Sequence, residues 1–230
     1  MLKLEGIVVE HDGFQLWADM EVPDGARVAV IGPSGAGKST LLNVIAGFQA
    51  ASAGRIFLAG QEVTKVPPGR RPLSVLFQDN NLFPHLTAAQ NVGLGLRPDL
   101  RLTAAQKTQV HQALQRVGLQ GLEARKPAQL SGGQQSRVAL ARVLVQDRPL
   151  VLLDEPFSAL GPAMKAEMLD LLQQLLGETG ATLLLVTHDP EDAKRIAPQT
   201  ILVADGAAQG PLDTQQTFAD PPKALRDYLG

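Results

Sequence analysis

The first residues that could do chemistry form a glycine-rich stretch, GPSGAGKST, at residues 32–40. It follows an apolar run and matches G-x-x-x-x-G-K-[ST], a pattern whose backbone N–H groups fold around a phosphate at a helix start. The lysine of this pattern bridges the terminal phosphates, and the hydroxyl after it suits Mg²⁺. A glycine-rich turn with a solvated lysine is the alternative. We expect a phosphate-binding loop made of Gly32, Pro33, Ser34, Gly35, Ala36, Gly37, Lys38, Ser39 and Thr40.

Two adjacent carboxylates, Asp154 and Glu155, follow a second apolar run, LVLL. A nucleoside triphosphate with Mg²⁺ needs a carboxylate at the end of a neighbouring strand, and we assign that role to Asp154. Adjacent residues at a strand end point in different directions, so Glu155 is available to polarise a water for attack on the γ-phosphate. Two acids after a strand are more often a solvated strand end, so this assignment depends on the phosphate loop.

A second glycine-rich helix start, LSGGQ, precedes the apolar helical stretch SRVALARVLV. Two glycines and a serine at a helix start favour anion binding for the same physical reason as the first loop. A flexible glycine cap is the alternative for this motif taken alone. The expected second anion site comprises Leu130, Ser131, Gly132, Gly133 and Gln134.

Together these motifs resemble those of the ATP-binding cassette family, and the resemblance covers nearly all of the chain. It implies that two copies pair head to tail, with the phosphate loop of one and the LSGGQ of the other enclosing each ATP. It also implies that Gln78 senses the γ-phosphate and Mg²⁺, that His188 contacts the γ-phosphate and that Glu155 is the catalytic base. The expected catalytic residues are Glu155, His188, Gln78 and Lys38, and the expected Mg²⁺ ligands are Ser39, Gln78 and Asp154.

Family members usually stack an aromatic side chain near the N-terminus on adenine. The equivalent position here is His11, and Phe14 is close by in the sequence. An imidazole stacks less strongly than a tyrosine. Both residues therefore stay open as the adenine contact.

The elements that must position these groups form an α/β fold. Short apolar runs at residues 27–32, 150–153 and 182–186 indicate buried parallel strands, whereas FQLWADMEV alternates like an antiparallel strand. Helical signals dominate from about residue 86, with capping boxes at Thr87 and Thr103. We expect a P-loop NTPase (RecA-like) core with an antiparallel β subdomain, formed by residues 1–85 and 146–230. Residues 86–145 should form an inserted helical subdomain with the signature motif, within one nucleotide-binding domain of residues 1–230.

Composition excludes several classes of function. The net charge of −2 over 230 residues gives no basic face for a nucleic-acid partner, and the lack of cysteine excludes disulfides and thiol chemistry. No apolar run approaches the roughly 20 residues that span a bilayer. If the chain works at a membrane, other chains supply the spans.

Bare cassettes of this size are usually motors of importers, which implies a peripheral place on the cytoplasmic face of the inner membrane, separate permease chains and, indirectly, a periplasmic solute-binding protein. The segment FQDNNLF and the later NVGLGL resemble the thiamine branch of these importers. Residues Asn80 to His85 fall where such cassettes receive the permease, although an exposed loop is the alternative. Ferric iron, sulfate, phosphate, polyamines and sugars remain as other solutes.

Other classes make different predictions. A soluble cassette of translation or DNA repair would carry a second cassette or a long coiled-coil insertion. A P-loop kinase or GTPase would lack LSGGQ, and a GTPase would carry N-K-x-D, which does not occur here.

One position departs from the family pattern. The residue after SAL is usually aspartate, and here it is Gly161, followed by Pro162, which suits the first turn of a helix. We expect the fold to tolerate this glycine because glycine at an N-cap costs only about a few tenths of a kcal/mol relative to aspartate. We also expect weaker coupling between the two ATP sites.

Overall fold

The computed structural model describes residues 1–11, 13–79 and 81–229, with side chains as far as residue 226. It divides into two compact units. The first contains residues 1–73, 149–155 and 176–230, and the second contains residues 74–148 and 156–175. The predicted helical subdomain of residues 86–145 lies within the second unit, which also takes in flanking segments that no change of composition marks.

The first unit is built on a large sheet whose strands run in the order β5-β4-β1-β2-β10-β9-β3-β8-β7. Its antiparallel part comprises β1 (Leu2–His11), β2 (Phe14–Val22), β4 (Ala53–Leu58) and β5 (Gln61–Glu62). Along β2, every second residue from Leu16 to Val22 is buried, and the residues between are exposed. The predicted alternation is therefore confirmed, because one face of this strand covers the core.

The parallel part carries the candidate site. It comprises β3 (Arg27–Ile31), β7 (Leu150–Asp154), β8 (Thr182–Val186) and β9 (Gln199–Ala204), with β3 paired to both β8 and β9. Their residues are almost entirely buried, as expected of strands covered on both faces. The strand β10 (Ala207–Asp213) pairs antiparallel with β9 and parallel with β2, and so joins the two parts of the sheet.

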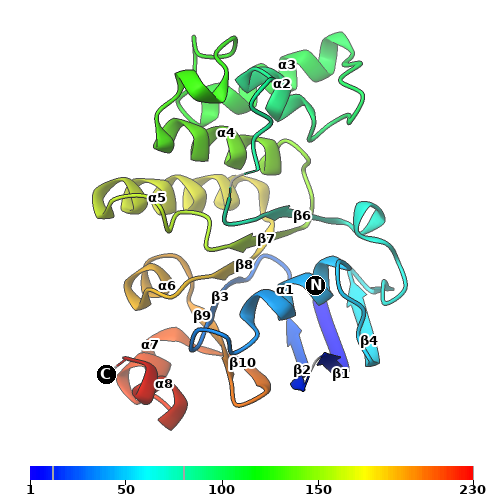
Figure 1. Cartoon of the computed structure of the whole chain (residues 1–230), viewed down its shortest axis with the longest axis vertical. Helices are drawn as coiled ribbons and strands as arrows, with labels where there is room; N and C mark the ends of the chain where they lie inside the picture. Colours follow the sequence, from blue (N-terminus) through cyan, green and yellow to red (C-terminus); the bar gives the residue numbers. More distant parts are fainter. Residues whose placement is uncertain (12, 80, 230) are drawn as a thin grey trace. The chain divides into compact units, whose positions relative to one another are not determined.

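Helices of the first unit pack on this sheet (Figure 1). The helix α1 (Lys38–Ala46) contacts β7, and α6 (Pro190–Ile196) contacts β3. Both α7 (Thr214–Ala219) and α8 (Lys223–Leu229) contact β9. A short 3-10 turn, η1 (Pro68–Arg70), precedes β6 (Leu73–Leu76), which begins where the first unit ends.

The second unit is mainly helical. In Figure 1 its helices α2 (Ala88–Gly93), α3 (Ala104–Arg116) and α4 (Gly132–Leu144) lie together, and each contacts the other two. The turn η2 (Pro127–Gln129) leads into α4, and most of α5 (Pro162–Thr179) belongs to this unit.

Local signals in the second unit match the structure closely. The capping boxes at Thr87 and Thr103 are both formed, so the two predicted helix starts are confirmed. On α3, Val110, Ala113 and Leu114 are buried, because residues three and four positions apart lie on one face of a helix. The helix α5 begins at Pro162, as expected from its restricted φ.

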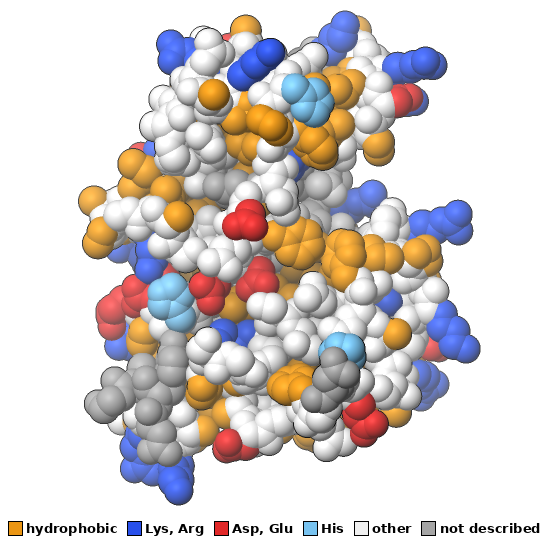
Figure 2. Space-filling model, in the orientation of Figure 1, with side chains coloured by type: hydrophobic (Ala, Val, Ile, Leu, Met, Phe, Trp, Pro, Cys, Tyr) orange, Lys and Arg blue, Asp and Glu red, His pale blue; other side chains and the backbone are white. Residues whose placement is uncertain are grey.

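The surface carries both signs of charge. On the face shown in Figure 2, acidic side chains and lysine and arginine side chains are both exposed. Across the described ranges, no helix is both long and apolar enough to cross a membrane.

Candidate nucleotide-binding site

The phosphate loop joins the end of β3 at Ile31 to the start of α1 at Lys38. Gly32, Gly35 and Gly37 have φ values of 150°, 78° and 105°, which are strained for other residues. A Cβ on Gly32 would lie 1.9 Å from the carbonyl oxygen of Val203. The loop can therefore adopt this path only with glycine at these positions, as its sequence predicts.

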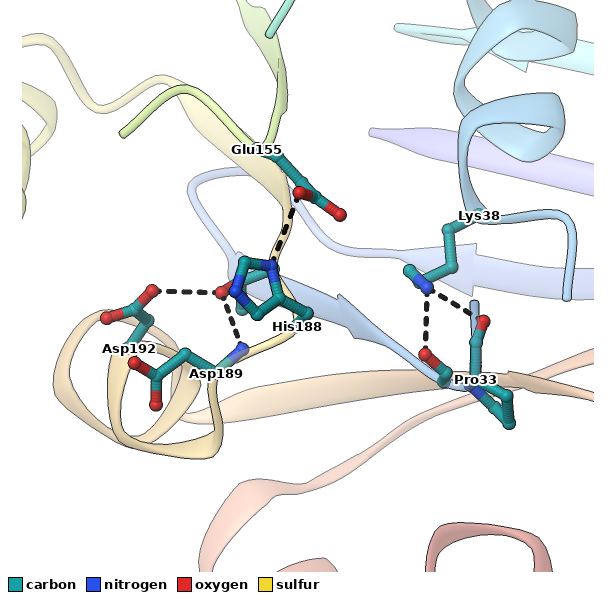
Figure 3. Close-up of polar contacts among 8 residues, drawn as sticks. Pro33, Lys38, Glu155, His188, Asp189 and Asp192 are labelled. Atoms are coloured by element: carbon teal, nitrogen blue, oxygen red, sulfur yellow. Dashed lines mark hydrogen bonds and ion pairs between the residues drawn. The ribbon is translucent and has the colours of Figure 1, made fainter. Parts of the chain in front are cut away.

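Lys38 lies over this loop and is 8% exposed. Its Nζ donates hydrogen bonds to the carbonyl oxygens of Gly32 at 2.8 Å and Pro33 at 2.9 Å (Figure 3). Burial lowers the pKa of Lys38, and the nearby charges of Glu155 and Asp154 oppose that shift. The ammonium group is thus held at the loop by backbone oxygens, where a bound phosphate would gain a charge-assisted contact.

The start of α1 fits a phosphate for a second reason. Its N-cap is Gly37, which makes no side-chain cap hydrogen bond. The first N–H groups of a helix have no partner within the helix, and they carry partial positive charge. The loop therefore offers donors and a cation to the same anion.

The two predicted metal ligands of the first unit lie together. Burial raises the pKa of Asp154, at the end of β7, above its usual value. A hydrogen bond donated by Ser39 opposes part of that rise. Among the described residues, no group of three or more histidine or acidic side chains could hold a metal. A site with one carboxylate and one hydroxyl suits Mg²⁺, which usually completes its shell with phosphate oxygens and water.

Glu155 and His188 face one another at the ends of β7 and β8. The Nδ1 atom of His188 lies 3.3 Å from Oε2 of Glu155 (Figure 3), and their side chains are 53% and 25% exposed. The backbone N–H of Glu155 donates to the carbonyl of Val186 at 3.1 Å, and Glu155 has a φ of 45°. The hydrogen bond across to β8 holds this left-handed turn, and the Glu155 carboxylate points toward His188.

The loop after β8 is fixed by its own polar groups. Thr187 donates from Oγ1 to Oδ2 of Asp192 at 2.9 Å and accepts from the backbone N–H of Asp189 at 3.1 Å (Figure 3). Asp189 is the N-cap of α6. His188 lies between these anchored residues, so its backbone is held while its side chain stays accessible.

The two candidate adenine contacts occupy different environments. His11 is exposed and, with Phe14, lines a hollow of about 430 Å³ at the turn between β1 and β2. The ring of Phe14 packs against the phosphate loop, because its Cζ atom lies 2.6 Å from where a Cβ on Gly37 would stand. His11 also lines a second hollow with Asn43, Phe48 and Gln49, so Phe14 is the one of the two whose described contact is with the phosphate loop.

The signature residues begin α4 in the second unit. The Oγ of Ser131 accepts from the backbone N–H of Gln134 at 3.3 Å, and Oε1 of Gln134 accepts from the backbone N–H of Ser131 at 3.0 Å. A Cβ on Gly133 would lie 2.2 Å from Sδ of Met164, whereas one on Gly132 would meet nothing within 4 Å. Leu130 is buried and anchors the motif. Gln78 also belongs to this unit and is exposed.

The predicted permease contact is only partly visible, because Asn80 lies outside the described residues. Phe83 is 47% exposed. The buried side chain of Asn91 organises this loop: it accepts from the N–H of Phe83 and donates to the carbonyls of Phe83, Leu86 and Thr87. Arg142 also donates to the carbonyl of Asn81 at 2.7 Å. No motif predicted Asn91 or Arg142, although a polar residue at a buried helix position is a signal for Asn91.

Comparison with known proteins places this geometry in a family. The family described as ABC transporter matches residues 17–158. The chain belongs to the ABC transporter family. As a member of this family it is an ATP-binding cassette ATPase with an α/β P-loop fold.

Among curated ABC relatives, the chain is 58% identical over 230 residues to a protein named thiamine import ATP-binding protein ThiQ from Cereibacter sphaeroides. It is 56% identical over 230 residues to the ThiQ protein of a Ruegeria species. Each alignment covers all of both chains. Two solved structures of the ABC cassette MJ0796, both dimeric and one with ADP and phosphate, have TM-scores of 0.79 and 0.78 at 30% identity. They cover 93% of this chain and 99% of the other.

Proposed function

We propose that this chain is the ATP-hydrolysing motor of an importer that carries thiamine or thiamine phosphates through a separate permease. The choice of thiamine as the solute is supported by the full-length identity of 58% and 56% to proteins named for thiamine import. The observation that supports the motor is the convergence of Lys38, Asp154 and Glu155 on one phosphate loop. The experiment below distinguishes thiamine from the other solutes that importers of this class carry.

Each residue then has a distinct part in ATP hydrolysis. Lys38 and the N–H groups at the start of α1 bind the β- and γ-phosphates and stabilise the charge that develops on them. Glu155 accepts a proton from the attacking water, and His188 holds Glu155 in place and contacts the γ-phosphate. Ser39, Asp154 and Gln78 would hold Mg²⁺, which neutralises phosphate charge when bound.

The signature motif acts on the ATP of a second copy. The two MJ0796 structures are dimeric, which supports a homodimer for this chain too. We propose a head-to-tail arrangement in which the start of α4 in one copy binds the γ-phosphate held by the other. Closing of the dimer then moves the permease, which docks at residues 80–85. The chain would lie on the cytoplasmic face of the inner membrane, and it would respond indirectly to a periplasmic thiamine-binding protein.

Reconstitution tests the solute. The chain is assembled in lipid vesicles with its thiamine permease, and ATPase activity is measured with thiamine-loaded, thiamine phosphate-loaded and empty binding protein. Loaded binding protein should stimulate hydrolysis about tenfold, and empty binding protein should not, because docking of the loaded protein favours the closed dimer. The proposal fails if loaded thiamine-binding protein leaves the rate unchanged while a binding protein for iron, sulfate, polyamine or sugar, supplied with its own permease, stimulates it.

A further inference from the structure

Arg71 is a buried cation at the far end of the helix that follows the phosphate loop. Its side chain belongs to the first unit, and the residue is 4% exposed. The Nη1 atom donates to the carbonyl oxygens of Val44 at 2.8 Å and Ile45 at 2.7 Å. These carbonyls belong to the last turn of α1, where no further helix N–H follows, and the carbonyl of Val44 also accepts from the backbone N–H of Gly47 at 3.1 Å.

The rest of the guanidinium is also held by backbone oxygens. Its Nε donates to the carbonyl of Val66 at 2.8 Å, and Nη2 donates to that of Thr64 at 3.1 Å. Burial lowers the pKa of Arg71, but a guanidinium keeps its proton in proteins. All the hydrogen bonds described for this group go to carbonyls, so the negative end of α1 is the charge that Arg71 faces.

Gly47 is shaped to admit this contact. It is the C-cap of α1, with a φ of 85°. A Cβ at this position would lie 2.6 Å from Nε and 2.7 Å from Cζ of Arg71. The glycine therefore serves two purposes, since it allows the left-handed cap and leaves room for the guanidinium.

The opposite end of the same helix binds phosphate in the proposed function. The nine residues of α1 span about 13 Å. Lys38 is the first of them, and the N–H groups of that turn face the loop. A rigid helix that is fixed at its C-terminal end keeps these donors in one orientation. A cation at that end also stabilises the helix through its dipole, whose positive end attracts the anion.

We propose that Arg71 is a positioning residue for ATP binding: it fixes the C-terminal end of α1 so that the N-terminal end holds the phosphates. Arg71 acts through the helix and does not touch the nucleotide. The inference rests on the proposed ATP site, and it predicts a loss of nucleotide affinity with little change in the rate of the chemical step. A purely structural role predicts a loss of stability alone.

The test uses the purified full chain with Arg71→Met, Arg71→Lys and the matched control Arg70→Met, whose side chain is on an exposed neighbour. The KM and kcat for ATP, and the Kd of a fluorescent ATP analogue, are measured well below the Tm of each variant. Arg71→Met should raise KM and Kd by about tenfold with kcat within about twofold. Arg71→Lys keeps a cation near the helix end, so its KM should rise by only about threefold. The control should match the unmutated chain.

A second variant changes the same contact and keeps the proposal testable if Arg71→Met does not fold. Gly47→Ala leaves Arg71 in the sequence but displaces its guanidinium, so it should also raise KM. Unchanged KM and Kd in every folded variant would overturn the proposal, as would a lysine variant no better than the methionine variant. If the unmutated chain binds the analogue without hydrolysing ATP, the proposed motor function is wrong. The Kd values still test whether Arg71 contributes to nucleotide binding.

Discussion

The chain has two glycine-rich helix starts that sequence patterns read as the same kind of anion site, and their structures differ. At α1 the N-cap is Gly37, and no side chain caps the helix. At α4 the N-cap is Ser131, and a complete capping box with Gln134 occupies the end of the helix. No side chain therefore competes with an anion at the start of α1, whereas the start of α4 satisfies part of its own hydrogen-bonding capacity.

This difference implies an order of events. We expect a nucleotide to bind first at the phosphate loop, where Lys38 can transfer its hydrogen bonds from the carbonyls of Gly32 and Pro33 to a phosphate. We expect the start of α4 to bind only the phosphate of an ATP held by a second copy, because the free energy of that contact must exceed the cost of disturbing Ser131 and Gln134. We therefore expect the phosphate loop to set the affinity for ATP and the signature helix to set the rate of hydrolysis.

The largest effect is expected when the cation of the phosphate loop is removed. Lys38→Ala should lower kcat/KM for ATP by about 10²- to 10³-fold and weaken binding as well, because the site loses its charge. Steady-state ATPase assays and analogue binding measure both effects. Lys107→Ala, on the exposed face of α3, is the control. Near-normal affinity in Lys38→Ala would show that the backbone alone holds the phosphates.

Removing the proposed base separates binding from chemistry. Glu155→Gln should reduce kcat by about 10²-fold or more while the Kd for ATP stays within about twofold, because the amide cannot accept the proton of the water. Glu191→Gln, an exposed acid on α6, is the matched control. Normal turnover in Glu155→Gln would remove this residue from its role.

The capping box offers a sharper test, because the chain has a matched pair. Ser131→Ala and Thr103→Ala each remove a capping-box hydroxyl, and each should cost about 1 kcal/mol of stability. Only Ser131→Ala should also lower kcat, by about tenfold, with the Kd of the phosphate loop unchanged. Equal kcat values in the two variants would make the start of α4 a structural cap and nothing more.

The smallest expected effect concerns Gly161. A Cβ there would meet nothing within 4 Å, and the residue is exposed, so Gly161→Asp fits the fold. We expect it to raise ATPase activity or its cooperativity about twofold with little change in Tm. Gly161→Ala separates the carboxylate from the added side chain. Kinetics that match the unmutated chain in both would show that this loop works through its backbone.

The sequence predicts the fold well where the signals are local. The buried strands at residues 150–153 and 182–186, and the helix starts at Thr87, Thr103 and Pro162, all depend on neighbours within a few positions. The contact of Arg71 with Val44, 27 positions away, leaves no local trace. The strand β10, which joins the two parts of the sheet, depends in the same way on pairing across the fold.

The candidate site shows the same division. The residue types at the phosphate loop and after β7 indicate ATP chemistry because the motif constrains the backbone itself. Glu155 and His188 are 33 positions apart in the sequence. They meet because they follow the neighbouring strands β7 and β8. The pattern S-x-x-Q at residues 131–134 is itself a capping-box signature, and reading it only as an anion site missed that it is satisfied within one chain. The roles of the site residues stay predictions until variants are measured.

Light scattering of the Glu155→Gln chain, with and without ATP, shows whether two copies share each nucleotide. We expect a monomer without nucleotide and a dimer with ATP and Mg²⁺, because the start of α1 in one copy and the start of α4 in the other would contact the same ATP. Adding Gly132→Glu, which fits the isolated chain because a Cβ there meets nothing within 4 Å, should abolish the dimer and leave ATP binding intact. A chain that binds ATP and stays monomeric, or a dimer that survives Gly132→Glu, would contradict this arrangement.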